Sequence, residues 1–261
     1  MIRGLVFIAV GTALASALCF GVASSRGPMD FTLANIEWGP DSPNAAKGPQ
    51  TTRTLPWQGS HDLTVNIAGT FLFKQGDTPG ITVTGPQKIV DDITLNSNSL
   101  NFSSPHHSLR SSKVVVTVTA PALNTITLNG FGTVTLDNYA QKTLDLTING
   151  AASVKGTGSV DRVKLVIDGA ASVNLSAMDM RDLDVEMNGA GSVKAGPTNK
   201  AKIGIDGAGS VKLTKRPAEF SKQIDGAGSV SMPDGAPAVP RAYQPAPTEK
   251  PDDHTEEDSS F

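Results

Sequence analysis

One short phrase recurs six times in the second half of the chain, and this recurrence limits the folds that the sequence can adopt. The copies read LNGFGTVTL, INGAASVKG, IDGAASVNL, MNGAGSVKA, IDGAGSVKL and IDGAGSVSM. Their first glycines are spaced by 20, 19, 20, 18 and 19 residues and are Gly130, Gly150, Gly169, Gly189, Gly207 and Gly226. A fixed period near 20 residues is typical of a solenoid, in which each repeat forms one turn and buries its apolar side only against its neighbours.

The hydrophobic pattern within each copy indicates strands. Counted from the first glycine, positions −4, −2, +4 and usually +6 are apolar, while −3, −1 and +5 are mostly polar. Two strands with a period of two residues, joined by a glycine-rich corner, explain this alternation. The sequence therefore predicts an all-β fold, a single-stranded parallel β-helix with turns of about 18–20 residues.

The first glycine of the corner is present in all six copies. Two physical reasons account for it: either its φ is positive, or its backbone meets the backbone of the turn above. The second glycine is replaced by Ala152 and Ala171 in two copies, so a left-handed conformation is not required there.

Stacking the turns about 4.8 Å apart places equivalent residues in columns on the outside of the coil. The column at −1, called the amide column below, reads Asn129, Asn149, Asp168, Asn188, Asp206 and Asp225. The column at +5, called the lysine column, reads Thr135, Lys155, Asn174, Lys194, Lys212 and Ser231. Because these groups recur with the turn, we interpret them as solvated structural ladders rather than as a catalytic site.

Upstream of the copies the sequence is also strand-like, with less regular turns between about residues 55 and 123. Apolar and β-branched runs at 63–67, 70–74, 81–84, 99–103 and 113–119 are separated by Gly, Pro, Asn or Asp. Residues 67–74 look like a degenerate seventh copy. No stretch after residue 24 has convincing helical periodicity.

The two ends differ from this domain in composition. An apolar run after Met1, Ile2 and Arg3 predicts an export signal over residues 1–24, and retention as a membrane anchor or lipidation at Cys19 are the alternatives. Residues 25–52 form a Pro-rich linker, residues 53–232 the β-helix, and residues 233–261 a Pro-rich acidic tail expected to be disordered. Cys19 is the only cysteine, so cleavage after it leaves no thiol for a disulfide.

Composition and motifs exclude several functions. The formal charge of −3 creates no basic field for nucleic acid. One Asp or Asn per turn is too few for the roughly six to eight oxygen ligands of Ca²⁺, and His106 and His107 are interpreted as a loop pair rather than a metal site. The chain contains no GxSxG, phosphate-loop or HExxH motif. We expect no catalytic residue, cofactor or metal.

The GAGSV phrases, the segment PALNTI at residues 121–126 that precedes the first of them, and the run from ITVTG at residues 81–85 to Val118 together resemble a known family. It is the bacterial "putative auto-transporter adhesin, head GIN domain" family. The resemblance covers about residues 55–232, with Phe131 in place of the first corner alanine. It implies a parallel β-helix on an exported protein and supplies no catalytic positions.

We therefore expect an exported, non-enzymatic binding or structural module of the bacterial cell envelope, in the periplasm or on the cell surface. Its partner would be an envelope or surface ligand, protein or glycan, and only an uncleaved N-terminal segment would contact a membrane. The alternative is an enzyme acting on envelope glycan. A lone cleft with clustered carboxylates and arginine within residues 55–120 would favour that alternative, whereas a flat surface with uninterrupted columns favours the binding module.

Overall fold

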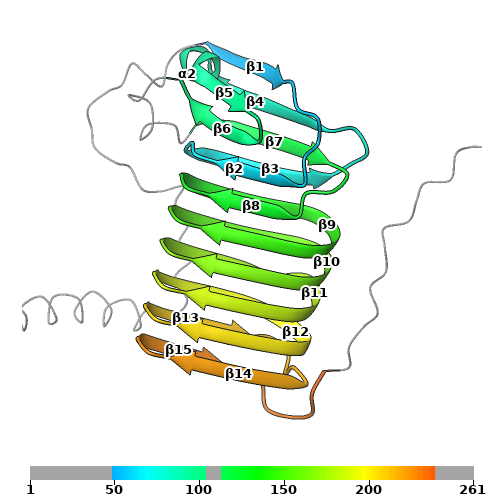
Figure 1. Cartoon of the computed structure of the whole chain (residues 1–261), viewed down its shortest axis with the longest axis vertical. Coiled ribbons are helices and arrows are strands. Elements are labelled where there is room, and N and C mark those ends of the chain that lie inside the picture. Colours follow the sequence, from blue (N-terminus) through cyan, green and yellow to red (C-terminus); the bar gives the residue numbers. More distant parts are fainter. Residues whose placement is uncertain (1–48, 104–112, 239–261) are drawn as a thin grey trace, which may run out of the picture. The chain divides into compact units, whose positions relative to one another are not determined.

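The computed structural model describes residues 49–103 and 113–238, all of which belong to one compact unit, residues 36–261. The export signal, most of the linker, His106 and His107, and residues 239–261 of the tail lie outside the described residues. Within the described part, hydrogen bonds join the strands into one 15-stranded sheet, which coils as a solenoid (Figure 1). This confirms the predicted fold class.

Each regular turn is one long, curved strand. The strands β9 to β12 have 16 to 18 residues. Only an Asn-Gly or Asp-Gly pair separates each of them from the strand that follows. They are β9 (Phe131–Ile148), β10 (Ala151–Ile167), β11 (Ala170–Met187) and β12 (Ala190–Ile205). All three neighbouring pairs are parallel, and equivalent repeat residues face one another, as Val154 faces Val134 and Val173.

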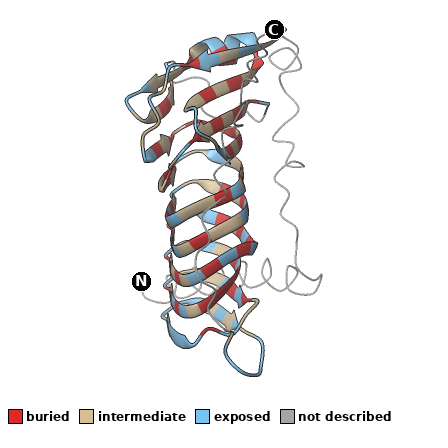
Figure 2. Cartoon of the chain, turned by 90° about the vertical axis from the view of Figure 1, so that its right-hand side faces the viewer, coloured by how far each residue is buried: buried red, intermediate tan, exposed pale blue. Residues whose placement is uncertain are grey.

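The apolar columns predicted from the sequence form the core. Val134, Val154, Val173, Val193 and Val211, all at position +4, are each at most 2% exposed. Positions −4 and −2 are equally buried through the turn that ends at Ile205. Buried and more exposed residues alternate along the strands (Figure 2). At about 1.5–3 kcal/mol for each buried Val, Leu or Ile side chain, these columns are the main favourable contribution to the stability of the coil.

The first part of the unit departs from a purely parallel coil. Its elements are β1 (Gln50–Leu55), β2 (Asp62–Val65), β3 (Gly69–Gln75), β4 (Gly80–Pro86), α2 (Gln87–Asp92), β5 (Ile93–Asn96), β6 (Ser99–Phe102), β7 (Val115–Ala120) and β8 (Thr125–Leu128). Strand β4 pairs antiparallel with β1 and β7, whereas β7 pairs parallel with β3, and β3 with β9. The stack therefore ends in antiparallel strands on this side, with β1 as the outermost strand (Figure 1).

The short helix α2 is consistent with the absence of convincing helical periodicity after residue 24. It has only six residues, too few to show a helical period, and it buries Ile89 and Val90. Arg53 Nη1 donates to the carbonyl oxygens of Val90 and Asp91, both at 3.2 Å, and so holds the end of the helix against β1.

The degenerate seventh copy exists, but its register is set by the strands around it. Gly69 pairs with Gly132 and Val65 with Leu128, so Ile67, not Gly69, lies at the position of the first corner glycine. Consequently Asn66 lies at −1, in line with the amide column.

The other end of the solenoid is formed by β13 (Ala208–Leu213), β14 (Glu219–Ile224) and β15 (Ala227–Ser231). Among the described residues, β14 pairs only with β12 and β15 only with β13, so both are edge strands. Here Lys222 takes the −4 position that Ile203 fills in the turn before. A charged side chain at an inward position discourages the edge from pairing with another chain.

Candidate binding surface

The six corner glycines stack directly on one another. A Cβ built on Gly169 would lie 1.8 Å from the carbonyl oxygen of Gly150, and the five other glycines have equivalent contacts of 1.8 to 2.1 Å. The same carbonyl of Gly150 accepts a hydrogen bond of 2.9 Å from the amide of Ala170. A side chain at this position would therefore occupy the space of the hydrogen-bonded backbone in the preceding turn.

This close approach explains why the first corner position is always glycine, because the alternative explanation, a positive φ at that position, does not hold. Positive φ occurs among the described glycines at Gly59, Gly158 and Gly235, and at none of the six corner positions.

The amide column forms a ladder of side-chain hydrogen bonds. Asn149 Nδ2 donates to Asn129 Oδ1 at 2.7 Å, and Asn129 Nδ2 donates to Asn66 Oδ1 at 2.6 Å. The ladder continues beyond the predicted column, since Asn66 Nδ2 donates to Asn101 Oδ1 at 2.7 Å. Asn66 and Asn101 were missed from the sequence, because their register depends on the irregular strands β2 and β6.

Aspartates interrupt the ladder because an ionised carboxylate can only accept hydrogen bonds. Asp168 accepts from Asn188 Nδ2 at 2.7 Å but has no proton to offer to Asn149. Asp206 follows Asn188 in the next turn, and Asp225, one turn further, accepts from Gln223 Nε2 at 2.7 Å. The amides of Asn129, Asn149 and Asn188 thus each donate to the preceding turn, and the last two turns carry adjacent acids.

The lysine column lies on the strand segments that follow the corners. Lys155 faces Thr135 and Asn174, whereas Lys194 and Lys212 face each other in consecutive turns. All three lysines are exposed, and none forms an ion pair with a described residue. Ser231 follows Lys212 in the last turn.

A groove opens beside this column at the C-terminal end of the solenoid. Its volume is about 520 Å³, and its lining includes Lys194, Lys212, Thr214, Ser231 and Met232, with no carboxylate. The groove lies where the chain leaves the regular turn, so the residues after β13 and β15 are needed to form it. Sequence analysis identified the two lysines but not the concave surface around them.

Two charged residues of the irregular region, Asp62 and Arg53, are bound by neighbouring groups of the fold. Asp62 accepts hydrogen bonds from Ser60 Oγ at 2.7 Å and from Asn98 Nδ2, and these bonds lower the pKa of its carboxyl group. Arg53 is bound to backbone carbonyls of α2. The described residues contain no group of three or more His, Cys, Asp or Glu that could hold a metal ion.

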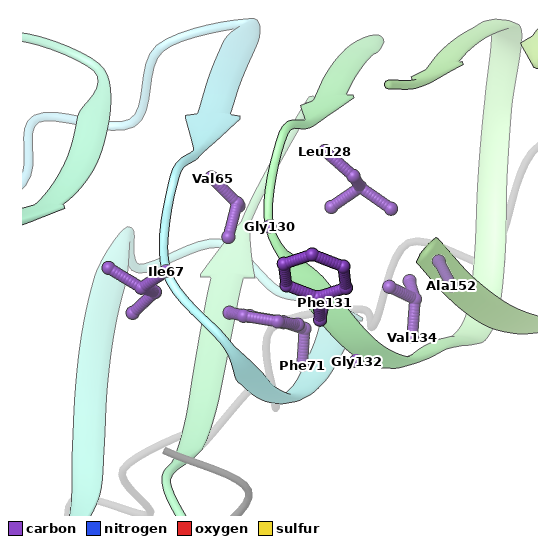
Figure 3. A pocket seen from close by; sticks show the side chains of 9 residues that line it. All are labelled: Val65, Ile67, Phe71, Leu128, Gly130, Phe131, Gly132, Val134 and Ala152. Atoms are coloured by element: carbon purple, nitrogen blue, oxygen red, sulfur yellow. The ribbon is translucent and has the colours of Figure 1, made fainter. Parts of the chain in front are cut away.

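The exposed aromatic Phe131, 49% exposed, covers an apolar recess at the first corner (Figure 3). Its lining includes Phe71, Leu128 and Val134, and the glycines Gly130 and Gly132. The recess is too narrow to admit a water-sized molecule, so it offers no room for a ligand.

The family described as "Putative auto-transporter adhesin, head GIN domain" matches residues 61–217, which contain five of the six corner glycines. The chain belongs to this family. The match begins just before β2 and ends in the segment between β13 and β14, so it covers the columns of the candidate surface except in the last turn, β14 and β15.

A solved structure shares the fold. A putative adhesin from Bacteroides fragilis is 19% identical, with a TM-score of 0.52 and coverage of 72% of this chain and 98% of its own. A putative adhesin from Parabacteroides merdae and a putative lipid binding protein from Parabacteroides distasonis are each 15% identical with the same coverages, at TM-scores of 0.44 and 0.42. No curated protein matches the chain. Family and fold together make the chain an adhesin-like β-helical module.

None of the helices in the described part of the chain is both long enough and apolar enough to cross a membrane.

Proposed function

We propose that this chain is an exported, non-enzymatic β-helical binding module of the bacterial cell envelope, acting in the periplasm or on the cell surface. In this proposal residues 1–24 direct export, the part of the Pro-rich linker 25–52 that precedes β1 separates the β-helix from its attachment point, and the Pro-rich acidic tail 233–261 follows the β-helix. The β-helix presents its outward columns to an envelope protein or glycan.

The observation that carries the proposal is the regularity of the outer surface. The glycine, amide and lysine columns run through successive turns, whereas a hydrolase or lyase needs one locally distinct constellation of catalytic groups. In the irregular region, Asp62 and Arg53 are held by neighbouring residues of the fold. The groove at the C-terminal end contains lysines and hydroxyls without a carboxylate, so it lacks the paired acids typical of glycoside hydrolysis.

The test is retention of the purified chain on intact bacterial envelopes. Binding should be saturable and should be lost after treatment of the envelopes either with protease or with periodate, which distinguishes a protein ligand from a glycan. Absence of retention would overturn the proposal. Release of soluble, newly reducing sugar during the incubation would instead show the envelope glycan-active enzyme.

A further inference from the structure

Charges on the strand segments that precede the corners compensate one another from turn to turn. In one column Asp145, Lys164, Asp184 and Lys202 face one another in this order. In a second column the order is Arg162, Asp182, Lys200 and Glu219. Lys202 Nζ lies 3.8 Å from Asp184 Oδ2, and Lys200 Nζ lies 3.6 Å from Glu219 Oε2. Opposite charges in neighbouring turns stabilise the stacking of strands.

The segments that follow the corners do not have this compensation. The six segments together contain three lysines, Lys155, Lys194 and Lys212, and no aspartate or glutamate; they are residues 131–136, 151–156, 170–175, 190–195, 208–213 and 227–232. Lys194 and Lys212 therefore lie directly opposite each other, as like charges on neighbouring strands whose backbones are about 4.8 Å apart. Like charges directly opposite each other in a sheet are unfavourable. These two lysines lie at the groove, whereas the segments that precede the corners, called the compensated side below, pair opposite charges.

The groove supplies further groups suited to an anionic ligand. Ser231 continues the column after Lys212 and adds an exposed hydroxyl, whereas the hydroxyl of Thr214, which also lines the groove, already donates its proton to the carbonyl oxygen of Ala195 at 3.3 Å. Leu213 and Met232 add apolar side chains to its lining. Two ammonium groups, one free hydroxyl and apolar side chains match an oxyanion carried on a ring with one apolar face.

We propose that this groove binds an acidic unit of a linear envelope glycan, with Lys194 and Lys212 contacting its carboxylate, sulfate or phosphate group. The chain of the glycan would continue along the serines at position +3, because Ser192 and Ser210 are exposed in the same two turns as the lysines. Nucleic acid is disfavoured because the large hydrophobic side chains exposed in the described residues are Phe131 and Phe220, neither of which lines the groove to stack a base. This inference rests on the proposed binding function and names its ligand class.

The experiment measures binding of the full chain to polygalacturonate oligomers, an acidic glycan, by calorimetry. The wild-type chain should bind them, with an affinity that decreases as salt is added, and should not bind dextran, a neutral glycan. The double variant Lys194→Gln/Lys212→Gln should lose affinity at least about tenfold, because both charge-assisted contacts are removed.

The matched control is Lys200→Gln/Lys202→Gln, which removes the same total charge from the compensated side and should change affinity less than about twofold. Equal losses in the two double variants would show a nonspecific charge effect and overturn the proposal. Binding to phosphatidylglycerol vesicles without binding to the oligomers would overturn it in favour of a lipid headgroup. Unchanged retention of Lys194→Gln/Lys212→Gln on envelopes would reject this groove while leaving the binding-module proposal intact, whereas no retention of the wild-type chain would reject both.

Discussion

Adding one methyl group to the glycine column should destabilise the solenoid much more than adding it elsewhere in the same strands. In Gly169→Ala the new Cβ would lie 1.8 Å from Gly150 O and 2.8 Å from Asn149 O. Carbon and oxygen atoms that are not bonded need more than 3 Å, so the two turns must separate locally by over about 1 Å. That movement stretches the 2.9 Å bond from the Ala170 amide to Gly150 O.

The expected cost follows from two contributions. Overpacking of a rigid site costs about 1–3 kcal/mol, and weakening one or two ladder hydrogen bonds costs about 1 kcal/mol for each. The sum is roughly 2–5 kcal/mol. For a domain of this size, 1 kcal/mol changes the melting temperature by about 2–4 °C, so we expect Tm to fall by roughly 4–20 °C in a circular dichroism melt.

The control is Gly204→Ala, in β12. The Cβ there would find only Val185 O within 4 Å, at 3.8 Å, and the φ of Gly204 is not in the left-handed region. This substitution should leave Tm unchanged or raise it slightly, because alanine reduces the conformational entropy of the unfolded chain. Hydrogen exchange should additionally show faster exchange at Ala170 in Gly169→Ala alone. Equal Tm losses for the two variants would refute the explanation by close approach.

Three further outcomes are expected. Asp206→Asn should stabilise the chain by about 0.5–1 kcal/mol in urea unfolding, since the new amide can donate to Asn188 Oδ1 and extend the ladder; a loss of stability would mean that the carboxylate itself holds a partner. Burial, with a smaller contribution from the charge of Asp145, raises the pKa of Tyr139, whose hydroxyl lies 2.6 Å from Leu123 O. The folded state therefore keeps this proton at a pH where the unfolded state releases it, so stability should fall as pH rises above about 10. Tyr139→Phe should cost about 1–2 kcal/mol at pH 8 and reduce that alkaline decline, and an identical slope between pH 8 and 11 would contradict this origin. A chelator should leave Tm unchanged, because apolar columns hold the coil together, and a drop of many degrees would reveal a structural metal.

The regular turns were predictable because residues separated by a constant number of positions in the sequence lie next to each other in stacked strands. With an offset near 19 residues, the valines at +4 and the asparagines at −1 can be placed in columns without coordinates. Asp145, Lys164 and Asp184 alternate in charge at nearly the same offset. Applying that offset to the segments that precede the corners would have predicted this charge column.

The irregular turns were not predictable, because their offset is not constant. Asn66 meets Asn101 and Asn129 across separations of 35 and 63 residues, and only the pairing of β2 with β6 and β8 determines these neighbours. The six-residue helix α2 and the antiparallel strand β4 likewise depend on packing at the end of the stack, where one face has no next turn to cover it.

The sequence by itself determined the coil, its period and which side chains point inward, since each follows from local alternation and from repetition at short range. Only the tertiary structure decided why the corner needs glycine, where the amide ladder begins and ends, and that Lys194 and Lys212 line a groove with Thr214 and Ser231. These features depend on distances between atoms of different turns. A repeat pattern shows which residues are neighbours but does not give those distances.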